Sequence, residues 1–502
     1  MGKTGLLLDV SGIQKYIFGT SKLKQNAGAS WIVEHILTEE YLEEKPIYSG
    51  GGNALLKFDN ETSAKEFARD WSLRILEEYP GLQPLAGLHT SEEYSDDNFG
   101  EFLNDCRKAL AKTKALYQTQ TELSRYGVTA ECIHTGGSAN YFDTKLTSGD
   151  NRSADAQYYS ELAKIKHLND DKAKDSLSNK IDVAKNDIPE NFNHIGGKTN
   201  DNYRSGIAVV HIDGNEMGHR FQKMKTLREY KELSEKVEKW VEKSVAFVTN
   251  KIEKLLKDSD DIRKDLGLEM SDIFPFRPII IGGDDVTYVC NSGLGLLTAK
   301  LFLDKFKELQ IEEGITENKL VSACAGVAFV KPSFPFAQAY DLAEDLCRSA
   351  KIRYRKFMRN IQNKENYEEP SFIDFHNLHS GIVESIETIR EDGYKLNGES
   401  LLGRPFGIDK GSESFDFMIK EVNKIKRWSK NKIKELREVV YKGSGAEEMF
   451  FAHLKKQNKD WIKPELPHAP RANFGNPTYL DYCEFLDVVP ESLLDTKYWE
   501  GK

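Results

Sequence analysis

The sequence of 502 residues predicts an α+β protein in which one α/β unit occurs twice. Each unit begins with an apolar run that ends in an aspartate, Asp9 in the first and Asp213 in the second. In both, a helical stretch, a glycine-rich hairpin and a second helix follow, and an Ala-Gly pair then marks the last strand. Three landmarks in the same order indicate a diverged internal duplication.

The composition indicates a globular protein without a membrane span. Apolar residues make up 39% of the chain, charged residues 30%, and the formal net charge is −10, which argues against a general nucleic-acid coat. The longest apolar run, residues 320–330, is far shorter than the roughly 20 residues that a membrane helix needs. A strand-like run begins at Gly5, so we expect no signal peptide and a cytoplasmic location.

The first unit covers residues 1–115. A buried strand is predicted at residues 5–10, and two further strands flank a glycine turn within residues 47–58. Ser63 and Glu66 have the spacing of a capping box at the start of the next helix. The unit closes with a short strand at residues 85–88, which carries the pair Ala86-Gly87.

Residues 116–203 form an intervening module. From about residue 145 the module is rich in Asp, Lys, Asn and Ser and has few large apolar residues. We therefore expect a solvated helical insertion or a partly mobile linker.

The second unit covers residues 204–390 and repeats the first on a larger scale. A strand at residues 207–212 leads into Asp213, and a long charged helix follows at residues 226–257. A second glycine hairpin spans residues 278–289, and a strand with Ala325-Gly326 precedes a last helix.

The remaining segment, residues 391–502, is predicted to be a helical domain. Between Lys420 and Lys442 it carries nine Lys or Arg residues against three Glu. This basic stretch is either a solvated helix face or a surface that contacts nucleic acid or a partner protein.

The strongest chemical signal is Gly282-Gly283-Asp284-Asp285 in the second hairpin. Two adjacent carboxylates repel each other, and the flanking apolar strands offer no counterion. The two glycines let a ligand approach the backbone closely. Successive strand residues point to opposite faces, so Asp284 is the better candidate for a bridging metal ligand. The alternative is an ordinary type I′ turn in which Asp and Gly are good turn formers.

Asp213 ends the neighbouring strand and can meet the hairpin carboxylates at one edge of the sheet. Oxygen ligands of this kind select Mg²⁺ or Mn²⁺, which also bind substrate phosphates. Two such ions can activate a ribose hydroxyl and stabilise departing pyrophosphate. Lys351, on the last helix of the second unit, can reach triphosphate oxygens, or it is a solvated surface lysine.

Several segments resemble one known family. Residues 9–18 (DVSGIQKYIF) resemble the first palm of the large polymerase/cyclase subunit of type III CRISPR effector complexes. The Asp213-Gly214-Asn215 segment and the Gly-Gly-Asp-Asp hairpin resemble its second palm. Residues 371–376 (SFIDFH) and 404–406 (RPF) resemble segments that follow this palm. Residues 480–486 (LDYCEFL) resemble the end of the family's helical domain.

The resemblance implies two ferredoxin-like palm domains of the nucleotide-cyclase type, an inserted module and a C-terminal helical domain. It implies conversion of ATP to cyclic or linear oligoadenylate messengers, with Mg²⁺ or Mn²⁺ held by Asp213, Asp284 and Asp285 as the catalytic residues. Nucleotide contacts are expected at Ser11, Gly50, Gly51, Gly52, Gly214, Asn215, Gly282, Gly283 and Lys351.

The sequence departs from the family pattern in three places. No His-Asp dipeptide of the family's nuclease domain occurs, so DNA cleavage is not expected. The inter-palm region offers only Cys132, so no zinc ribbon is expected there. In the first palm, Gly52 and Asn53 stand where carboxylates would be, so this copy is expected to hold a nucleotide without catalysing.

Three functions remain open from the sequence. The leading one is an ATP-consuming cyclase, working in a CRISPR complex with guide and target RNA or alone as a cyclic-dinucleotide synthase. The second is a catalytically silent scaffold subunit of a ribonucleoprotein, and the third a diguanylate cyclase. Because both palms lie within one chain, a homodimer is not required.

Overall fold

The protein is described here from a computed structural model. The described residues are 3–91, 94–117, 127–143, 157–200, 203–269, 271, 273–315, 320–361, 369–378, 384–408, 414–426, 428–457, 463–466 and 477–500.

The chain divides into two compact units, each built from more than one segment. The first contains residues 1–191 with 216–239 and 279–285. The second contains residues 192–215, 240–278 and 286–502.

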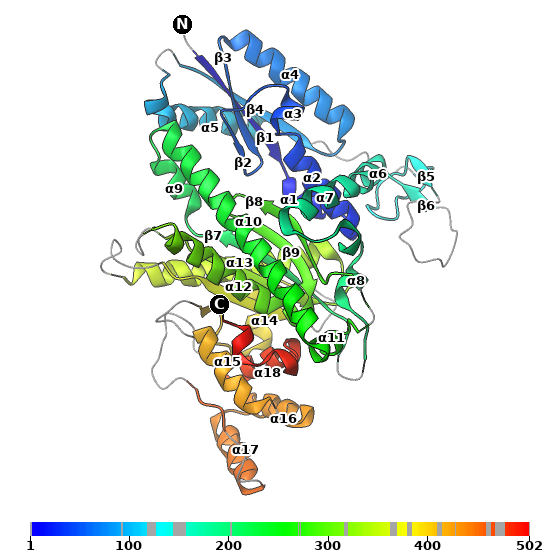
Figure 1. The fold of residues 1–502 in the computed structure, drawn as a ribbon, viewed down its shortest axis with the longest axis vertical. Coiled ribbons are helices and arrows are strands. Elements are labelled where there is room, and N and C mark those ends of the chain that lie inside the picture. Colours follow the sequence, from blue (N-terminus) through cyan, green and yellow to red (C-terminus); the bar gives the residue numbers. More distant parts are fainter. Residues whose placement is uncertain are drawn as a thin grey trace. The chain divides into compact units, whose positions relative to one another are not determined.

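A four-stranded sheet with the strand order β2-β3-β1-β4 forms the first palm (Figure 1). Asp9 near the end of β1 lies opposite Asn53 on β3 and Leu85 on β4, both in antiparallel register. Apolar side chains of β1 are buried because the strand is central in the sheet. Its strands are β1 (Lys3–Ser11), β2 (Tyr48–Gly50), β3 (Asn53–Phe58) and β4 (Gln83–Ser91).

Helices connect these strands in the order β-α-β-β-α-β. They are α1 (Ile13–Phe18), α2 (Leu23–His35), α3 (Glu39–Leu42), α4 (Glu61–Glu78) and α5 (Phe99–Leu116). The α4 helix starts earlier than its predicted capping box. Asn60 is the N-cap and accepts a hydrogen bond from the backbone N–H of Ser63, so the assignment of Ser63 as the cap was wrong.

Where the structure describes it, the intervening module contains helices and a short two-stranded sheet. Residues 144–156 of the predicted insertion lie outside the described residues. Helices α6 and α7 pack on α2 so closely that a Cβ on Gly28 would lie 1.9 Å from the carbonyl oxygen of Lys166. Because α6 and α7 are packed on α2, the predicted mobile linker is wrong for these two helices. The elements are β5 (Tyr141–Asp143), β6 (Gln157–Tyr159), α6 (Glu161–Leu168), α7 (Asp170–Ile181) and α8 (Phe192–Gly196).

The second palm has a six-stranded sheet with the order β14-β11-β10-β7-β9-β8. Within it, β10-β7-β9-β8 repeats the first sheet's order β4-β1-β3-β2. The register repeats as well, because Asp9 and Asp213 each lie opposite the residue that precedes an Ala-Gly pair. The predicted α+β fold with two palms is confirmed. The strands are β7 (Ile207–Gly214), β8 (Phe276–Gly282), β9 (Asp285–Asn291), β10 (Ala323–Val330), β11 (Phe372–Asn377) and β14 (Phe406–Gly407).

Helices α11 (Asp260–Asp265), α12 (Gly295–Glu312) and α13 (Phe336–Arg359) lie in the second unit with this sheet. Helix α9 (Met217–Lys223) and the start of α10 (Leu227–Asp258) belong to the first unit, and the rest of α10 to the second. One face of α13 buries Cys347, Ala350 and Tyr354 against Cys324 and Phe372 of the sheet. These apolar positions recur at helical spacing, which fixes the face that α13 presents to the sheet.

The C-terminal segment is mainly helical, as predicted. It contains α14 (Ile386–Gly393), the short pair β12 (Lys395–Leu396) and β13 (Glu399–Ser400), α15 (Ser414–Ile425), α16 (Lys430–Val440), α17 (Ser444–Gln457) and α18 (Tyr479–Val488). Several bases of the basic stretch are paired, for example Lys432 with Glu435 and Arg437 with Asp487. Such pairing favours the solvated-face interpretation. Among the helices described, none is both long and apolar enough to cross a membrane.

Candidate active site

The candidate site is built around the end of strand β7. The run Ile207–Ile212 is buried in the sheet, and Asp213 follows it with its side chain 36% exposed. The Nζ atom of Lys351 on α13 lies 2.5 Å from Oδ2 of Asp213 and donates a hydrogen bond of 3.0 Å to the carbonyl oxygen of Gly214. Lys351 therefore meets two predicted site residues that lie far before it in the sequence, Asp213 and Gly214, at one strand end.

A close helix–strand crossing makes this contact possible. A Cβ on Gly326 of β10 would lie 2.1 Å from the carbonyl oxygen of Ala343 and 2.4 Å from the backbone nitrogen of Cys347. Only glycine permits α13 to approach the sheet so closely. Lys351 lies one helical turn beyond Cys347 and thereby reaches the end of β7.

The Lys351 ammonium is held in its charged form. Burial alone would lower the pKa of Lys351, but the carboxylate of Asp213 outweighs burial and raises it above the ordinary value. The Lys351 side chain is 17% exposed. The predicted alternative, a solvated surface lysine, therefore does not describe it.

Asn215 faces the protein interior. It is 1% exposed, its backbone N–H donates to the carbonyl oxygen of Ser322 at 2.8 Å, and its Nδ2 donates to the Ser322 hydroxyl at 2.8 Å. These bonds fix the loop after β7 to the start of β10. The structure thus shows Asn215 bonded to Ser322, and its nucleotide role stays a prediction.

The Gly-Gly-Asp-Asp segment forms the turn between β8 and β9. Gly282 ends β8, Gly283 adopts a φ of 59°, Asp284 follows in the turn, and Asp285 begins β9. A Cβ on Gly282 or Gly283 would meet no atom within 4 Å. The backbone of this turn is therefore open to the approach of a ligand.

Strands β7 and β9 are neighbours in the sheet. Between them, Nδ1 of His211 lies 3.1 Å from the hydroxyl of Thr287, both side chains being buried. Burial is the main reason that the pKa of His211 is lowered to about 4. The imidazole is therefore neutral at physiological pH.

The first palm contains a second Asp–Lys pair, which the sequence analysis missed. Nζ of Lys114 on α5 lies 2.8 Å from Oδ2 of Asp9. A glycine also lies where helix α5 crosses strand β4, because a Cβ on Gly87 would lie 2.4 Å from the backbone nitrogen of Leu110. Lys114 follows Leu110 by four residues, as Lys351 follows Cys347. The spacing from the Ala-Gly pair did not reveal it, because Lys351 follows Gly326 by 25 residues whereas Lys114 follows Gly87 by 27.

The other predicted residues of the first palm lie around its own hairpin. Ser11 ends β1, Gly50 ends β2, and Gly51 and Gly52 form the turn with φ values of 59° and 79°. A Cβ on Gly52 would lie 2.5 Å from Cδ1 of Ile13. The position equivalent to Asp284 is therefore a glycine with a positive φ, where a side chain would require Ile13 to shift.

Within the described part of the chain, no group of three or more His, Cys, Asp or Glu side chains is arranged to hold a metal ion. At the end of β7 the charge of Asp213 is balanced by Lys351 instead.

Comparison with known proteins agrees with this architecture. Residues 206–359 match the family described as Cas10/Cmr2, second palm domain. No curated protein matches the chain.

Among solved structures, the chain is similar to Csm1 of T. onnurineus, with 13% identity and a TM-score of 0.55. It is also similar to a Csm1–Csm4 cassette in complex with pppApA (12% identity, TM-score 0.54) and to one in complex with one ATP (12%, 0.53). Each match covers 97% of this chain and 69% of the other. Residues 206–359 are therefore similar to the second palm domain of the Cas10/Cmr2 family, and the chain shares its overall fold with Csm1 structures.

Proposed function

We propose that this protein is a metal-dependent nucleotidyltransferase that converts ATP to cyclic or linear oligoadenylates and releases pyrophosphate. The observation that carries the proposal is the Asp213–Lys351 pair at the strand end of a palm whose hairpin reads Gly-Gly-Asp-Asp. An anionic metal ligand and a phosphate-binding cation stand side by side there. The first palm has an Asp–Lys pair as well, so it is the combination of the pair with the hairpin carboxylates that supports catalysis over a silent scaffold.

The equivalence of the two palms supports a shared carboxylate site. In the first sheet Asp9 lies opposite Asn53, the first residue of β3. The equivalent residues of the second sheet are Asp213 and Asp285, the first residue of β9. The second palm therefore has carboxylates where the first has Asp9 and an amide, which supports catalysis by the second palm alone.

The donor set suits Mg²⁺ or Mn²⁺. Asp213, Asp284 and Asp285 offer carboxylate oxygens, which hard divalent cations prefer. The turn at Gly282-Gly283, next to Asp284 in the sequence, is open. When bound, such an ion would neutralise phosphate charge and make a ribose hydroxyl more acidic.

The reaction is a nucleotidyl transfer. A ribose hydroxyl oxygen of one ATP bonds to the α-phosphorus of another, the bond from that phosphorus to the bridging oxygen of the β-phosphate breaks, and the hydroxyl proton passes to solvent. Lys351 would donate to triphosphate oxygens, since its ammonium has three donors at the strand end. The backbone of Gly214, Gly282 and Gly283 would approach the phosphates.

The first palm would hold the acceptor nucleotide near Ser11 and the turn of Gly50, Gly51 and Gly52. Because both palms belong to one chain, the proposal requires no homodimer. The likeness to a Csm1–Csm4 cassette supports work with CRISPR effector subunits. Action in the cytoplasm with guide RNA and target RNA is part of the proposal. That two of the similar structures contain ATP or pppApA supports ATP as the substrate class.

Incubation of the purified protein with ATP and Mn²⁺ tests the proposal. We expect pyrophosphate release and oligoadenylate products, resolved by chromatography and mass spectrometry. GTP in place of ATP separates this activity from a diguanylate cyclase. Absence of product from either nucleotide, with and without candidate target RNA and effector subunits, would favour the scaffold function.

A further inference from the structure

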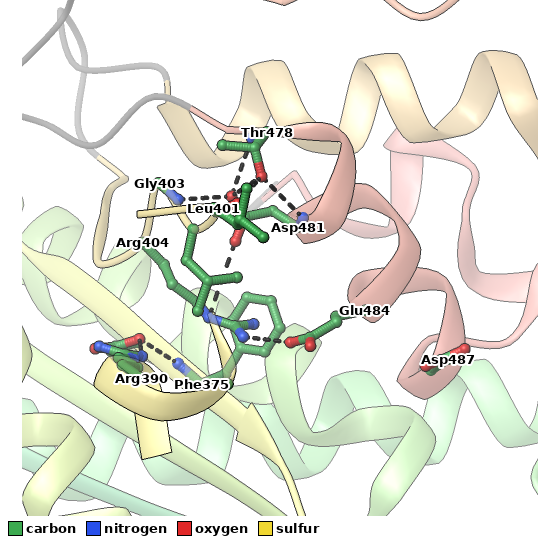
Figure 2. Close-up of polar contacts among 12 residues, drawn as sticks. Phe375, Arg390, Leu401, Gly403, Arg404, Thr478, Asp481, Glu484 and Asp487 are labelled. Atoms are coloured by element: carbon green, nitrogen blue, oxygen red, sulfur yellow. Dashed lines mark hydrogen bonds and ion pairs between the residues drawn. The ribbon is translucent and has the colours of Figure 1, made fainter. Parts of the chain in front are cut away.

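Three segments that the proposed function leaves without a role meet in one buried cluster of charges. They are β11, the loop around Arg404 and helix α18 (Figure 2). The cluster contains Asp374, Arg390, Arg404, Asp481 and Glu484. Four of these side chains are at most 4% exposed, and Arg390 is 20% exposed.

Arg404 is the centre of the cluster. Its guanidinium pairs with Glu484, lies 3.9 Å from Asp481 and stacks 4.2 Å from the ring centre of Phe375. Asp481 also accepts hydrogen bonds from the backbone of Gly403 at 2.8 Å and of Thr478 at 3.0 Å. Helix α18 is thereby paired with Arg404, which in turn stacks on Phe375 of strand β11.

The cluster continues from β11 to helix α13 through Arg390 of α14. Its Nη2 and Nη1 atoms donate to the two oxygens of Asp374 at 2.6 and 2.9 Å, which is a bidentate pair. Nη1 also donates to the hydroxyl of Ser349 at 3.2 Å. Ser349 lies on α13, two residues before Lys351.

Asp374 is an anion in this setting. Burial would raise the pKa of Asp374, but Arg390 first, then Arg404 and the Ser349 hydroxyl, hold it below the ordinary value. The charge of Asp374 also attracts Arg353, which lies one turn beyond Ser349 on α13. The carboxylate therefore faces the side of α13 that carries Ser349 and Arg353.

Ser349 and Lys351 lie on different sides of the helix, since two residues correspond to more than half a turn. A bond to Ser349 from the β11 side therefore limits rotation of α13 about its axis. Rotation is what would carry Lys351 Nζ away from Asp213 and Gly214, which it contacts on the β7 side. The packing at Gly326 sets the distance of α13 from the sheet, whereas the Ser349 bond sets its rotation.

We propose that Asp374 and Arg390 are positioning residues for Lys351, acting through Ser349, with Arg404 and α18 as their anchor. The expected effect on ATP turnover rests on the proposed function. The positioning of Lys351 by Ser349 does not depend on it. The buried cluster holds α13 in the rotation that places Lys351 on Asp213. Neither Asp374 nor Arg390 touches the substrate in this arrangement.

The test is the variant Ser349→Ala in the full chain, because it removes one hydroxyl and leaves every buried charge paired. We expect covalent amine labelling of Lys351, quantified by mass spectrometry, to increase about fivefold relative to Lys300 on α12, the factor that corresponds to one typical hydrogen bond. Among kinetic constants, KM for ATP should rise by a similar factor, and kcat should change less. Ser349→Thr retains a hydroxyl and should restore both values.

A matched control is Arg348→Ala. Arg348 is the neighbour of Ser349 on α13, but it pairs with Asp345 and Glu344 rather than with the cluster. It should leave the labelling of Lys351 unchanged. The double variant Asp374→Asn/Arg390→Gln removes both buried charges together and should match Ser349→Ala; if it does not fold, Ser349→Ala decides alone.

Labelling of Lys351 that stays at the wild-type rate in folded Ser349→Ala would overturn the inference. An equal increase in Arg348→Ala would overturn it too, because any change on α13 would then suffice. If wild-type protein turns over no nucleotide, the proposed function fails, while the labelling result still decides whether Ser349 positions Lys351.

Discussion

Nζ of Lys351 lies 2.5 Å from Oδ2 of Asp213, and Nζ of Lys114 stands in the same relation to Asp9 at 2.8 Å. Each lysine follows by four residues the position where its helix crosses a strand glycine. The duplication has therefore kept an Asp–Lys pair in both palms. Only the second palm combines it with two hairpin carboxylates. This difference underlies the predictions that follow.

The double variant Asp284→Ala/Asp285→Ala should abolish pyrophosphate release and leave the fold intact. Removal of neighbouring carboxylates lowers mutual repulsion, so we expect the free energy of unfolding to change by less than about 1 kcal/mol. A malachite-green assay with pyrophosphatase measures turnover, and circular dichroism measures stability. Wild-type turnover in this variant would show that the hairpin is only a turn.

Asp213→Asn should weaken Mn²⁺ binding and reduce turnover by roughly 10²–10³-fold, because a metal-ligand charge is lost while the side-chain shape is kept. Titration with Mn²⁺ followed by electron paramagnetic resonance reports the binding. Asp9→Asn is the matched control in the first palm and should leave the Mn²⁺ titration as in the wild type. Equal titrations for all three proteins would mean that Asp213 is a strand-end residue without a metal role.

Lys351→Met should raise KM for ATP by about tenfold or more, since a charge-assisted hydrogen bond to phosphate is worth about 1.5–3 kcal/mol. Methionine keeps the apolar stem that packs under the site. Lys114→Met removes the equivalent cation of the first palm, where we expect weaker acceptor binding without loss of metal affinity. If Lys351→Met leaves KM unchanged, the lysine serves only to neutralise Asp213.

Gly50→Ala tests the first palm's hairpin. Gly51 and Gly52 have φ values of 59° and 79°, so larger residues there strain the backbone itself. At Gly50 a Cβ would meet its nearest atoms at 3.9 Å, an ordinary contact, so the fold should tolerate alanine. We expect lower turnover at an unchanged melting temperature if phosphate approaches this backbone. Gly445→Ala, also with open space around it, is the control.

A dilution series tests whether a single chain is sufficient for activity. Specific activity per chain should stay constant on dilution, because both palms are supplied by one chain. Activity per chain that falls with dilution would show that two chains are needed.

Acid should destabilise the intervening module through His134. Burial is the main reason that the pKa of His134 is lowered to about 4, and the Gln25 amide lies 2.5 Å from its Nδ1. The unfolded state binds more protons between about pH 6.5 and 4, so stability is lost as pH falls through this window. Allowing for partial exposure, His134→Asn should reduce the loss by about 1–2 kcal/mol. Thermal melts of both proteins at pH 7 and pH 4.5 measure the difference; parallel losses would exclude His134 as the cause.

The sequence by itself determined the secondary structure and the duplication. Apolar runs ending at Asp9 and Asp213, and glycine turns at Gly51 and Gly283, depend on residues near in sequence, so strand and turn patterns predict them. The repeated landmarks indicated a duplicated α/β unit, and the family resemblance implied that each copy is a palm. The metal and nucleotide roles of the predicted residues stay predictions.

Only the tertiary structure decided which side chains meet. It paired Lys351 with Asp213, turned Asn215 inward to Ser322, and brought Asp374, 16 residues before Arg390, into a buried pair that also holds α13. Such contacts depend on sheet register and on the rotation of each helix. Side-chain packing across the whole core sets the sheet register and the helix rotations together. A local sequence pattern therefore cannot predict these contacts.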